Sequence, residues 1–194
     1  SEFMVALKGE NEASVSWNLT GLHNISNALS AIAAARNVGI TVANSTAALN
    51  RFKNVKRRME VIYQKNGVTV YDDFAHHPTA IQTTLTGLRK KVGDEPIIAV
   101  VELASNSMKQ GIHQSTLGPS LQEANIGFIY RSPGMQWDMT ALEQADDQLY
   151  IMDSIEEILA ALAASVEGTC HILIMSNGHF EGLYGRIKRQ LGAD

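Results

Sequence analysis

The feature that most constrains the fold is the alternation of short, continuous apolar runs with helix-like segments over the second half of the chain. The runs are IIAVVE (97–102), IGFIY (126–130), QLYI (148–151) and HILIM (171–175). Helix-like sequence lies at 115–124 and again after the capping box formed by Ser154 and Glu157. Strands without a polar face are buried on both sides, as in parallel sheets covered by crossover helices. The alternation therefore predicts an α/β fold with a Rossmann-like, doubly wound and mostly parallel sheet.

A hairpin is predicted just ahead of these strands. Residues 59–63 and 68–72 are rich in strand formers and flank Asn66-Gly67, the dipeptide that best tolerates the positive φ angles of a tight turn. Pro78 suits the first position of a helix, and apolar residues then recur at helical spacing as far as Lys91. The polar stretch YDDFAHHPT therefore joins a strand to a helix.

The first quarter of the chain has a different character. A helix rich in alanine is predicted from Gly21 to Gly39, where the glycine suits a left-handed cap, and a shorter helix from Ser45 to Phe52. Few strands are evident there, so residues 4–55 are interpreted as the C-terminal portion of another domain and residues 56–194 as a complete doubly wound domain. Residues 1–3 resemble a cloning scar and are set aside.

Composition excludes several functional classes. Apolar residues make up 45% and charged residues 19% of the chain, as in ordinary soluble domains, and a net charge of -4 gives no reason to expect a nucleic acid or an anionic membrane as partner. No apolar stretch approaches the roughly 18 residues of a membrane span, and the N-terminus lacks the features of a signal peptide. We therefore expect a cytoplasmic protein. The single cysteine, Cys170, lies in an apolar run and is expected to be a buried thiol.

Three polar loops follow predicted strands: DDFAHHPT, ELASNSMKQG and SNGHFEG. In open parallel sheets, ligands bind at the C-terminal ends of the strands, where loops enter the next helices and expose free backbone N–H groups. If the predicted sheet forms, these loops share one edge and line one cleft.

Titratable side chains concentrate in the first of these loops. Asp72 and Asp73 could bind a metal or a nucleotide ribose, or one could cap a turn while the other is solvated. Neighbours on a strand point to opposite faces, and Asp73, nearer the loop, is the better candidate. His76 and His77 could carry protons, bind a metal or donate to phosphate, or one could cap the helix while the other packs. No Cys or His at ligand spacing supports a zinc site, and no metal ligand is assigned.

Arg57 and Arg58 end the basic run KNVKRR at the expected domain boundary. Such a run is usually a solvated face, but the planar fork of arginine also matches phosphate oxygens. Asn24 and Asn27 share one face of a helix start, where one could cap the helix or an amide could read a purine edge. The sequence contains no GxxxxGK[ST], GxGxxG, HExxH or GxSxG motif. By themselves these residues indicate only a domain for a nucleotide or another anionic ligand.

Three segments in order, GLHNISNALSAIAAA, FKNVKRRMEV and YDDFAHHPTAI, resemble the Mur ligase family of ATP-dependent enzymes, which form amide bonds in peptidoglycan precursors. The third segment is similar to that of the two members acting on UDP-N-acetylmuramate, one adding L-alanine and one adding a whole tripeptide. SNSMK (105–109) and MSNGHF (175–180) resemble the tripeptide-adding member. The resemblance implies L-alanyl-gamma-D-glutamyl-meso-diaminopimelate as the tripeptide, an acyl phosphate formed with ATP and Mg²⁺, and a role in peptidoglycan recycling.

The resemblance also implies roles for single residues. Asn24 and Asn27 would meet the adenine, an arginine of the pair Arg57-Arg58 and Asp73 would reach the nucleotide, and the two histidines would face the junction of acyl phosphate and amine. The residues that would hold the tripeptide are Ser105, Asn106, Lys109, Ser176 and Asn177.

Two departures from the family pattern stand out. The usual EPRSN reads ELASN here, so that Ala104 replaces an arginine, and MSNGGFGG becomes MSNGHFEG, with His179 and Glu181 at glycine positions. If that arginine binds a carboxylate of the peptide in other members, the affinity or specificity of this chain for the peptide differs from theirs. The resemblance covers the end of a central ATPase domain and the C-terminal domain, without the phosphate loop, so the chain alone is expected to be inactive. The alternatives are the alanine-adding ligase and a non-catalytic module that binds peptide or nucleotide.

Overall fold

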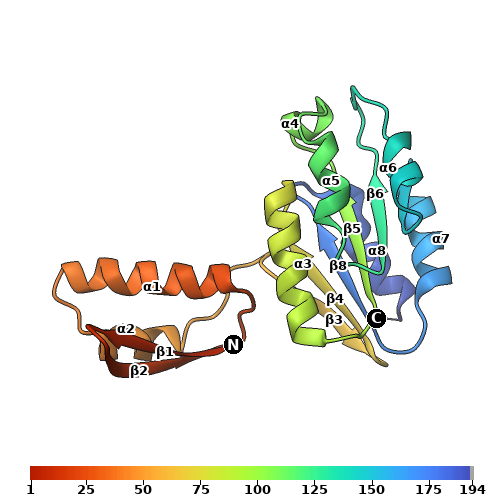
Figure 1. Ribbon diagram of the computed structural model, residues 1–194. Coiled ribbons are helices and arrows are strands. Elements are labelled where there is room, and N and C mark those ends of the chain that lie inside the picture. Colours follow the sequence, from red (N-terminus) through yellow and green to blue (C-terminus); the bar gives the residue numbers. More distant parts are fainter. Residues whose placement is uncertain (193–194) are drawn as a thin grey trace. The chain divides into compact units, whose positions relative to one another are not determined.

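The computed structural model describes residues 1–192 of the chain, which divides into two compact units, Ser1–Val55 and Lys56–Asp194. Figure 1 colours the chain from its N-terminus to its C-terminus. The first unit holds two strands and two helices, and the second holds the large sheet with its covering helices. What the first unit corresponds to in a longer protein stays a prediction.

The first unit is a β-hairpin packed with two helices. Strands β1 (Glu2–Leu7) and β2 (Glu10–Ser16) pair antiparallel, and helices α1 (Leu22–Asn37) and α2 (Val42–Leu49) follow. Each of these four elements contributes a buried residue to a small apolar core: Val5, Val15, Ile32 and Val42.

Three features of this unit were not expected from the sequence. Residues 1–3 were set aside, yet Glu2 and Phe3 belong to β1, and the Phe3 ring meets the Trp17 ring edge-on with centroids 5.8 Å apart. The hairpin was also missed, because its strands are short and mostly exposed and carry no continuous apolar run. Helix α2 begins before the predicted Ser45, because Thr41 caps it by accepting a hydrogen bond from the Asn44 backbone N–H at 3.2 Å.

The second unit contains a six-stranded sheet in the order β3-β4-β8-β5-β6-β7. Only β3 is antiparallel to its neighbour, and the other strands are parallel. The bounds are Glu60–Lys65 for β3, Val68–Asp73 for β4, Ile97–Glu102 for β5, Ile126–Tyr130 for β6, Leu149–Met152 for β7 and Cys170–Met175 for β8. This sheet confirms the predicted doubly wound, mostly parallel α/β fold.

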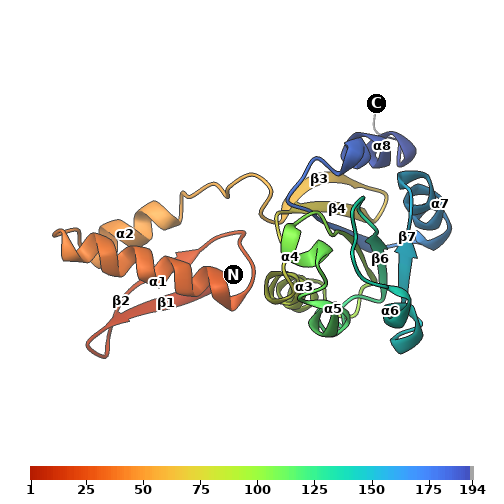
Figure 2. The same cartoon turned by 90° about the horizontal axis from the view of Figure 1, so that it is seen from above.

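Helices cover both faces of this sheet. In Figure 2, α3 (Pro78–Val92), α4 (Asn106–Lys109), α5 (Gln114–Ser120) and α6 (Thr140–Ala145) lie on one side, and α7 (Ile155–Ser165) and α8 (Leu183–Gln190) on the other. A single-turn helix, η1 (Phe180–Gly182), leads into α8. Each face has its own apolar core, one built around Leu85, Val101 and Leu173 and the other around Val100, Ile158 and Ile174.

The local sequence explains these elements. Every residue of β4, β5 and β8 is buried, as expected for strands covered on both faces. Asn66 and Gly67 both have positive φ in the β3–β4 turn, and Pro78 begins α3 as predicted. Ser154 caps α7 by accepting a hydrogen bond from the Glu157 N–H at 3.2 Å. The short helices α4 and α6 were not predicted, because four and six residues are too few to establish a helical period.

Within residues 1–192, no helix combines the length and the apolar character that crossing a membrane requires.

Candidate binding site at the carboxyl edge of the sheet

The three polar loops leave the same edge of the sheet. Because β4, β8 and β5 are parallel neighbours, the segments after Asp73, Met175 and Glu102 start side by side. The Ser176 backbone N–H donates to the Asp73 carbonyl at 3.1 Å and ties the first loop to the last. The carboxyl ends of β5 and β6 point to the top of Figure 1, where α4 lies. The structure therefore has the shared rim that the sequence predicted.

Arg57 joins three elements at this rim. Its Nε lies 3.2 Å from the Asp72 carboxylate, and its terminal nitrogen donates to the Ser176 carbonyl at 2.7 Å and to the Tyr184 hydroxyl at 2.8 Å. Burial opposes the charge, but Tyr184 and Asp72 outweigh that effect, so the pKa of Arg57 is raised. Burial, followed by the nearby Asp72 carboxylate, raises the pKa of Tyr184 to about 12. Arg57 is therefore a cross-link between β4, the loop after β8, and α8.

Asp73 is buried and anchors the start of its loop. One carboxylate oxygen accepts from the Met59 N–H and the other from the Ala75 N–H, both at 2.8 Å. Burial raises the pKa of Asp73, although these two backbone hydrogen bonds partly counteract it. Both carboxylate oxygens of Asp73 are thus engaged by backbone, one in its own loop and one in the segment before β3, as expected for a positioning residue. Asp72, its neighbour on the strand, faces Arg57 instead.

The two histidines differ in what they contact. His76 is half-buried, and its Nδ1 lies 2.8 Å from the Phe74 carbonyl. His77 is exposed, caps α3 by accepting from the Thr79 N–H at 3.4 Å, and stacks edge-on against His113 with centroids 4.2 Å apart. Desolvation, followed by the nearby imidazoles, lowers the pKa of His77. The alternative in which one histidine caps the helix and the other packs therefore matches the geometry.

A buried carboxylate organises the loop after β8. The Ser176 hydroxyl donates to Glu102 and accepts from the Gly178 N–H at 2.8 Å. Ser176 is fully buried, so its hydroxyl stabilises the loop and is not available to a ligand at the rim. The adjacent Asn177 Oδ1 is buried without a hydrogen-bond partner in the part of the chain described. A buried acceptor without a donor is costly, which makes Asn177 the clearest candidate to receive a ligand N–H group.

The segment after β5 carries the remaining predicted contacts. Ser105 is the N-cap residue of α4 and lies half-buried, with its hydroxyl 3.4 Å from that of Ser107. Asn106 is exposed, and Lys109 is half-buried at the end of α4. On the β4 side of the rim, the exposed Arg58 guanidinium lies over the Phe74 ring at 5.7 Å.

The departure at Glu181 has a structural explanation. Its φ of 46° is in the left-handed region, which favours glycine, so the family glycine at this position suits the backbone. Here the Glu181 carboxylate accepts a hydrogen bond from the Tyr130 hydroxyl at 2.7 Å. Burial, with that hydrogen bond, raises the pKa of Tyr130 to about 12.

Asn24 and Asn27 belong to the first unit. Asn24 lies in the first turn of α1, where its side-chain N–H donates to the Thr20 carbonyl at 2.7 Å, and Asn27 is exposed. Neither side chain caps α1. Within residues 1–192, neither side-chain amide oxygen accepts a hydrogen bond.

Sequence analysis missed three residues of the rim: Glu102, His113 and Tyr184. Glu102 ends a predicted strand, which was a usable signal, since polar groups at strand ends define such edges. His113 and Tyr184 gave none, because their contacts with His77 and Arg57 join residues 36 and 127 positions apart. Among residues 1–192, no three His, Cys, Asp or Glu side chains are placed to hold a metal ion together.

The fold and the rim together define a class: a doubly wound α/β domain with a ligand-binding edge at the carboxyl ends of three neighbouring parallel strands. Residues 57–178 match the family described as Mur ligase, glutamate ligase domain. The chain belongs to the Mur ligase family.

Several relatives of this chain are longer proteins. The chain is 42% identical over 98% of its length to UDP-N-acetylmuramate--L-alanyl-gamma-D-glutamyl-meso-2,6-diaminoheptandioate ligase of Haemophilus influenzae, of which it covers 43%. Its identity to the Escherichia coli K12 protein of the same name is 43%, over 96% of this chain and 41% of that protein. The crystal structure of a murein peptide ligase from Psychrobacter arcticus 273-4 matches all of this chain with a TM-score of 0.75 and 40% identity, over 42% of that chain. The chain thus spans about two-fifths of these proteins.

Proposed function

We propose that this chain is the C-terminal part of a cytoplasmic, ATP-dependent ligase that joins L-alanyl-gamma-D-glutamyl-meso-diaminopimelate to UDP-N-acetylmuramate in peptidoglycan recycling. Identity of 42% over 98% of the chain to a protein of that name supports this substrate pair. In this proposal, residues 4–55 are the end of the central ATP-binding domain and residues 56–194 are the C-terminal ligase domain. The remaining N-terminal and central domains complete the active site.

The chemistry demands charge neutralisation and positioning more than a protein nucleophile. ATP with Mg²⁺ supplies the phosphoryl group that activates the muramyl carboxylate for attack by the peptide amine. The rim fits the anionic part of this reaction, because the Arg58 guanidinium and the Nε2–H of His77, whose Nδ1 accepts from the Thr79 N–H, are donors at its β4 end. His76 donates its Nδ1–H to the Phe74 carbonyl and offers Nε2 as an acceptor for a proton of the peptide amine. Arg57 and Asp73 act here as positioning residues. Asn24 and Asn27 are proposed to meet the adenine.

The tripeptide is assigned to the β5 and β8 side of the rim. Lys109 offers an ammonium group for a peptide carboxylate, Ser105 and Asn106 offer hydrogen bonds, and Ser176 holds the loop in place. The observation that carries this assignment is the buried, unpartnered Oδ1 of Asn177, which a peptide N–H would satisfy. The replacement of an arginine by Ala104 removes one cation from this side.

The test uses the full-length parent protein, ATP and UDP-N-acetylmuramate, with either the tripeptide or L-alanine as the amine. Mass spectrometry of the products should show the UDP-N-acetylmuramyl tripeptide and ADP. Exclusive formation of the L-alanine product would instead identify the alanine-adding ligase. Absence of any product, with retained calorimetric binding of tripeptide, would make the protein a binding module and refute the proposed reaction.

A further inference from the structure

A second concave site lies between helices α5 and α6, in a groove of about 590 Å³. None of the candidate residues of the carboxyl-edge site lines it. Its volume lies within the range of pockets that hold small organic ligands, about 300–1,000 Å³. The groove is therefore large enough for a ligand of its own.

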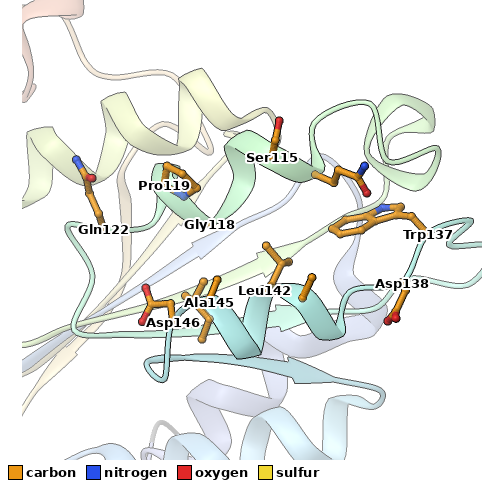
Figure 3. Close-up of a pocket in the computed structure, with 12 residues that line it drawn as sticks. Ser115, Gly118, Pro119, Gln122, Trp137, Asp138, Leu142, Ala145 and Asp146 are labelled. Carbon is orange, nitrogen blue, oxygen red and sulfur yellow. The ribbon is translucent and has the colours of Figure 1, made fainter.

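The floor of this groove is apolar and made largely of small residues. Gly118 and Pro119 of α5 face Leu142 and Ala145 of α6 across it, as Figure 3 shows. Ala141 of α6 also lines the groove. The Leu142 side chain lies only 3.6 Å from the position of a Cβ on Gly118. A narrow apolar floor, on which small residues lie beside Leu142 and Leu149, suits an unbranched aliphatic chain.

Each end of the groove carries a carboxylate. Asp138 and Asp146 lie at opposite ends of α6 in Figure 3, with Trp137 near the first. Hydrogen bonds from Thr140 lower the pKa of Asp138, which keeps that carboxylate charged. All lining residues fall within the described part of the chain, and none of them is Lys, Arg or His. A carboxylate is a suitable partner for an ammonium group.

From this charge complementarity we infer that the groove binds a linear aliphatic ligand with an ammonium group at each end, of the diamine or polyamine class. The alkyl part lies along the small apolar residues and the Trp137 ring, one ammonium contacts Asp138, and the other contacts Asp146. α6 has six residues and spans about 9 Å at 1.5 Å per residue, which sets the scale of the separation between the two charges.

The groove is mechanically connected to the carboxyl-edge site. The Trp137 indole N–H donates to the Met108 carbonyl at 2.8 Å, and the Gln136 N–H donates to the Lys109 carbonyl at 2.8 Å. Trp137 also packs on Gly111, where a Cβ would lie 2.8 Å from the indole. A ligand that contacts Trp137 therefore also acts on the backbone of α4.

Binding is measured by titrating this chain with octamethylenediamine, with octylamine and sebacate as matched probes that lack one charge or invert both. In a Trp17→Phe variant, Trp137 is the only tryptophan left and its fluorescence reports the groove. The diamine should saturate, bind more tightly than octylamine and weaken as salt rises, because exposed charge pairs are screened. Sebacate should not bind. Backbone amide shifts of 108–111 and 137–149 in the unsubstituted chain provide the same readout if Trp17→Phe fails to fold.

Asp146→Asn provides the decisive variant, because the amide oxygen can still accept the hydrogen bond from the Gln148 N–H that Asp146 receives at 2.9 Å. Its diamine affinity should fall by about two- to fivefold, the scale of one exposed charge pair. Asp147→Asn, which removes a neighbouring exposed carboxylate outside the groove, should bind as the unsubstituted chain does. Equal affinity for sebacate, failure of the diamine to saturate, or equal losses in the two variants would overturn the inference.

Discussion

At the scale of single residues, the charged groups of the rim divide by what they already contact. Arg57 and Asp73 are buried or half-buried in hydrogen bonds to other parts of the fold, whereas Arg58 and His77 are exposed. A side chain that holds a loop is costly to remove wherever the ligand binds. Structural and ligand roles at this edge are therefore separable by experiment.

Asp73→Ala should destabilise the fold. The substitution leaves the buried N–H groups of Met59 and Ala75 without their acceptor, which should lower the free energy of unfolding by about 1–3 kcal/mol. The family resemblance alone implied a contact of Asp73 with the nucleotide. Urea denaturation of this chain measures the change, with the exposed Asp94→Ala as a control expected within about 0.5 kcal/mol. A stable Asp73→Ala variant would return Asp73 to the list of direct ligand contacts.

His77 should titrate below the ordinary histidine range, because desolvation and the imidazoles of His113 and His76 lower its pKa. A histidine with a depressed folded pKa binds fewer protons when folded. Its contribution to stability is therefore present above about pH 6.5 and lost as the pH falls through the folded pKa. Imidazole proton shifts in NMR titrations give the midpoint, which should rise in His113→Gln. An unchanged midpoint in that variant would show that the His77–His113 contact is not maintained in solution.

At the scale of elements, the loop after β8 depends on the glycine at its turn. A Cβ at Gly178 would lie 2.9 Å from Glu102 Oε2, and a hydrogen bond from the Ser176 hydroxyl holds that carboxylate in position. Gly178→Ala should therefore cost about 1–3 kcal/mol through overpacking. Gly185→Ala in α8 is the matched control, since its nearest atom is 3.7 Å away and the substitution should stabilise the helix by up to about 1 kcal/mol. Thermal unfolding of both variants tests this, and equal midpoints would contradict the packing described.

Several of these elements were predictable from the sequence, and others were not. The β3–β4 hairpin, α3 and the buried strands β5 and β8 followed from turn chemistry, helix starts and apolar runs, because these signals are local. The shared rim followed from the rule that parallel strands present their carboxyl ends on one edge. The cross-linking role of Arg57 could not be predicted from the sequence. Its partners Asp72, Ser176 and Tyr184 lie up to 127 positions away, and no local pattern encodes such contacts.

At the scale of the whole molecule, the second unit should fold by itself. All six strands of the large sheet and both of its apolar cores lie within residues 56–194. A protein truncated to these residues should keep a cooperative unfolding transition, with a midpoint within a few degrees of the corresponding transition in the longer chain. Circular dichroism during heating measures it. Loss of the transition would mean that residues 1–55 are required for the sheet to form.

The central claim is that the loops after β4, β5 and β8 form one ligand-binding rim. Its most direct test is to map backbone amide shifts of this chain during titration with L-alanyl-gamma-D-glutamyl-meso-diaminopimelate up to millimolar concentration. We expect the largest shifts in those three loops, with Asn177 and Lys109 among the affected residues. No shifts at any concentration, or shifts confined to the α7 and α8 face, would contradict the claim.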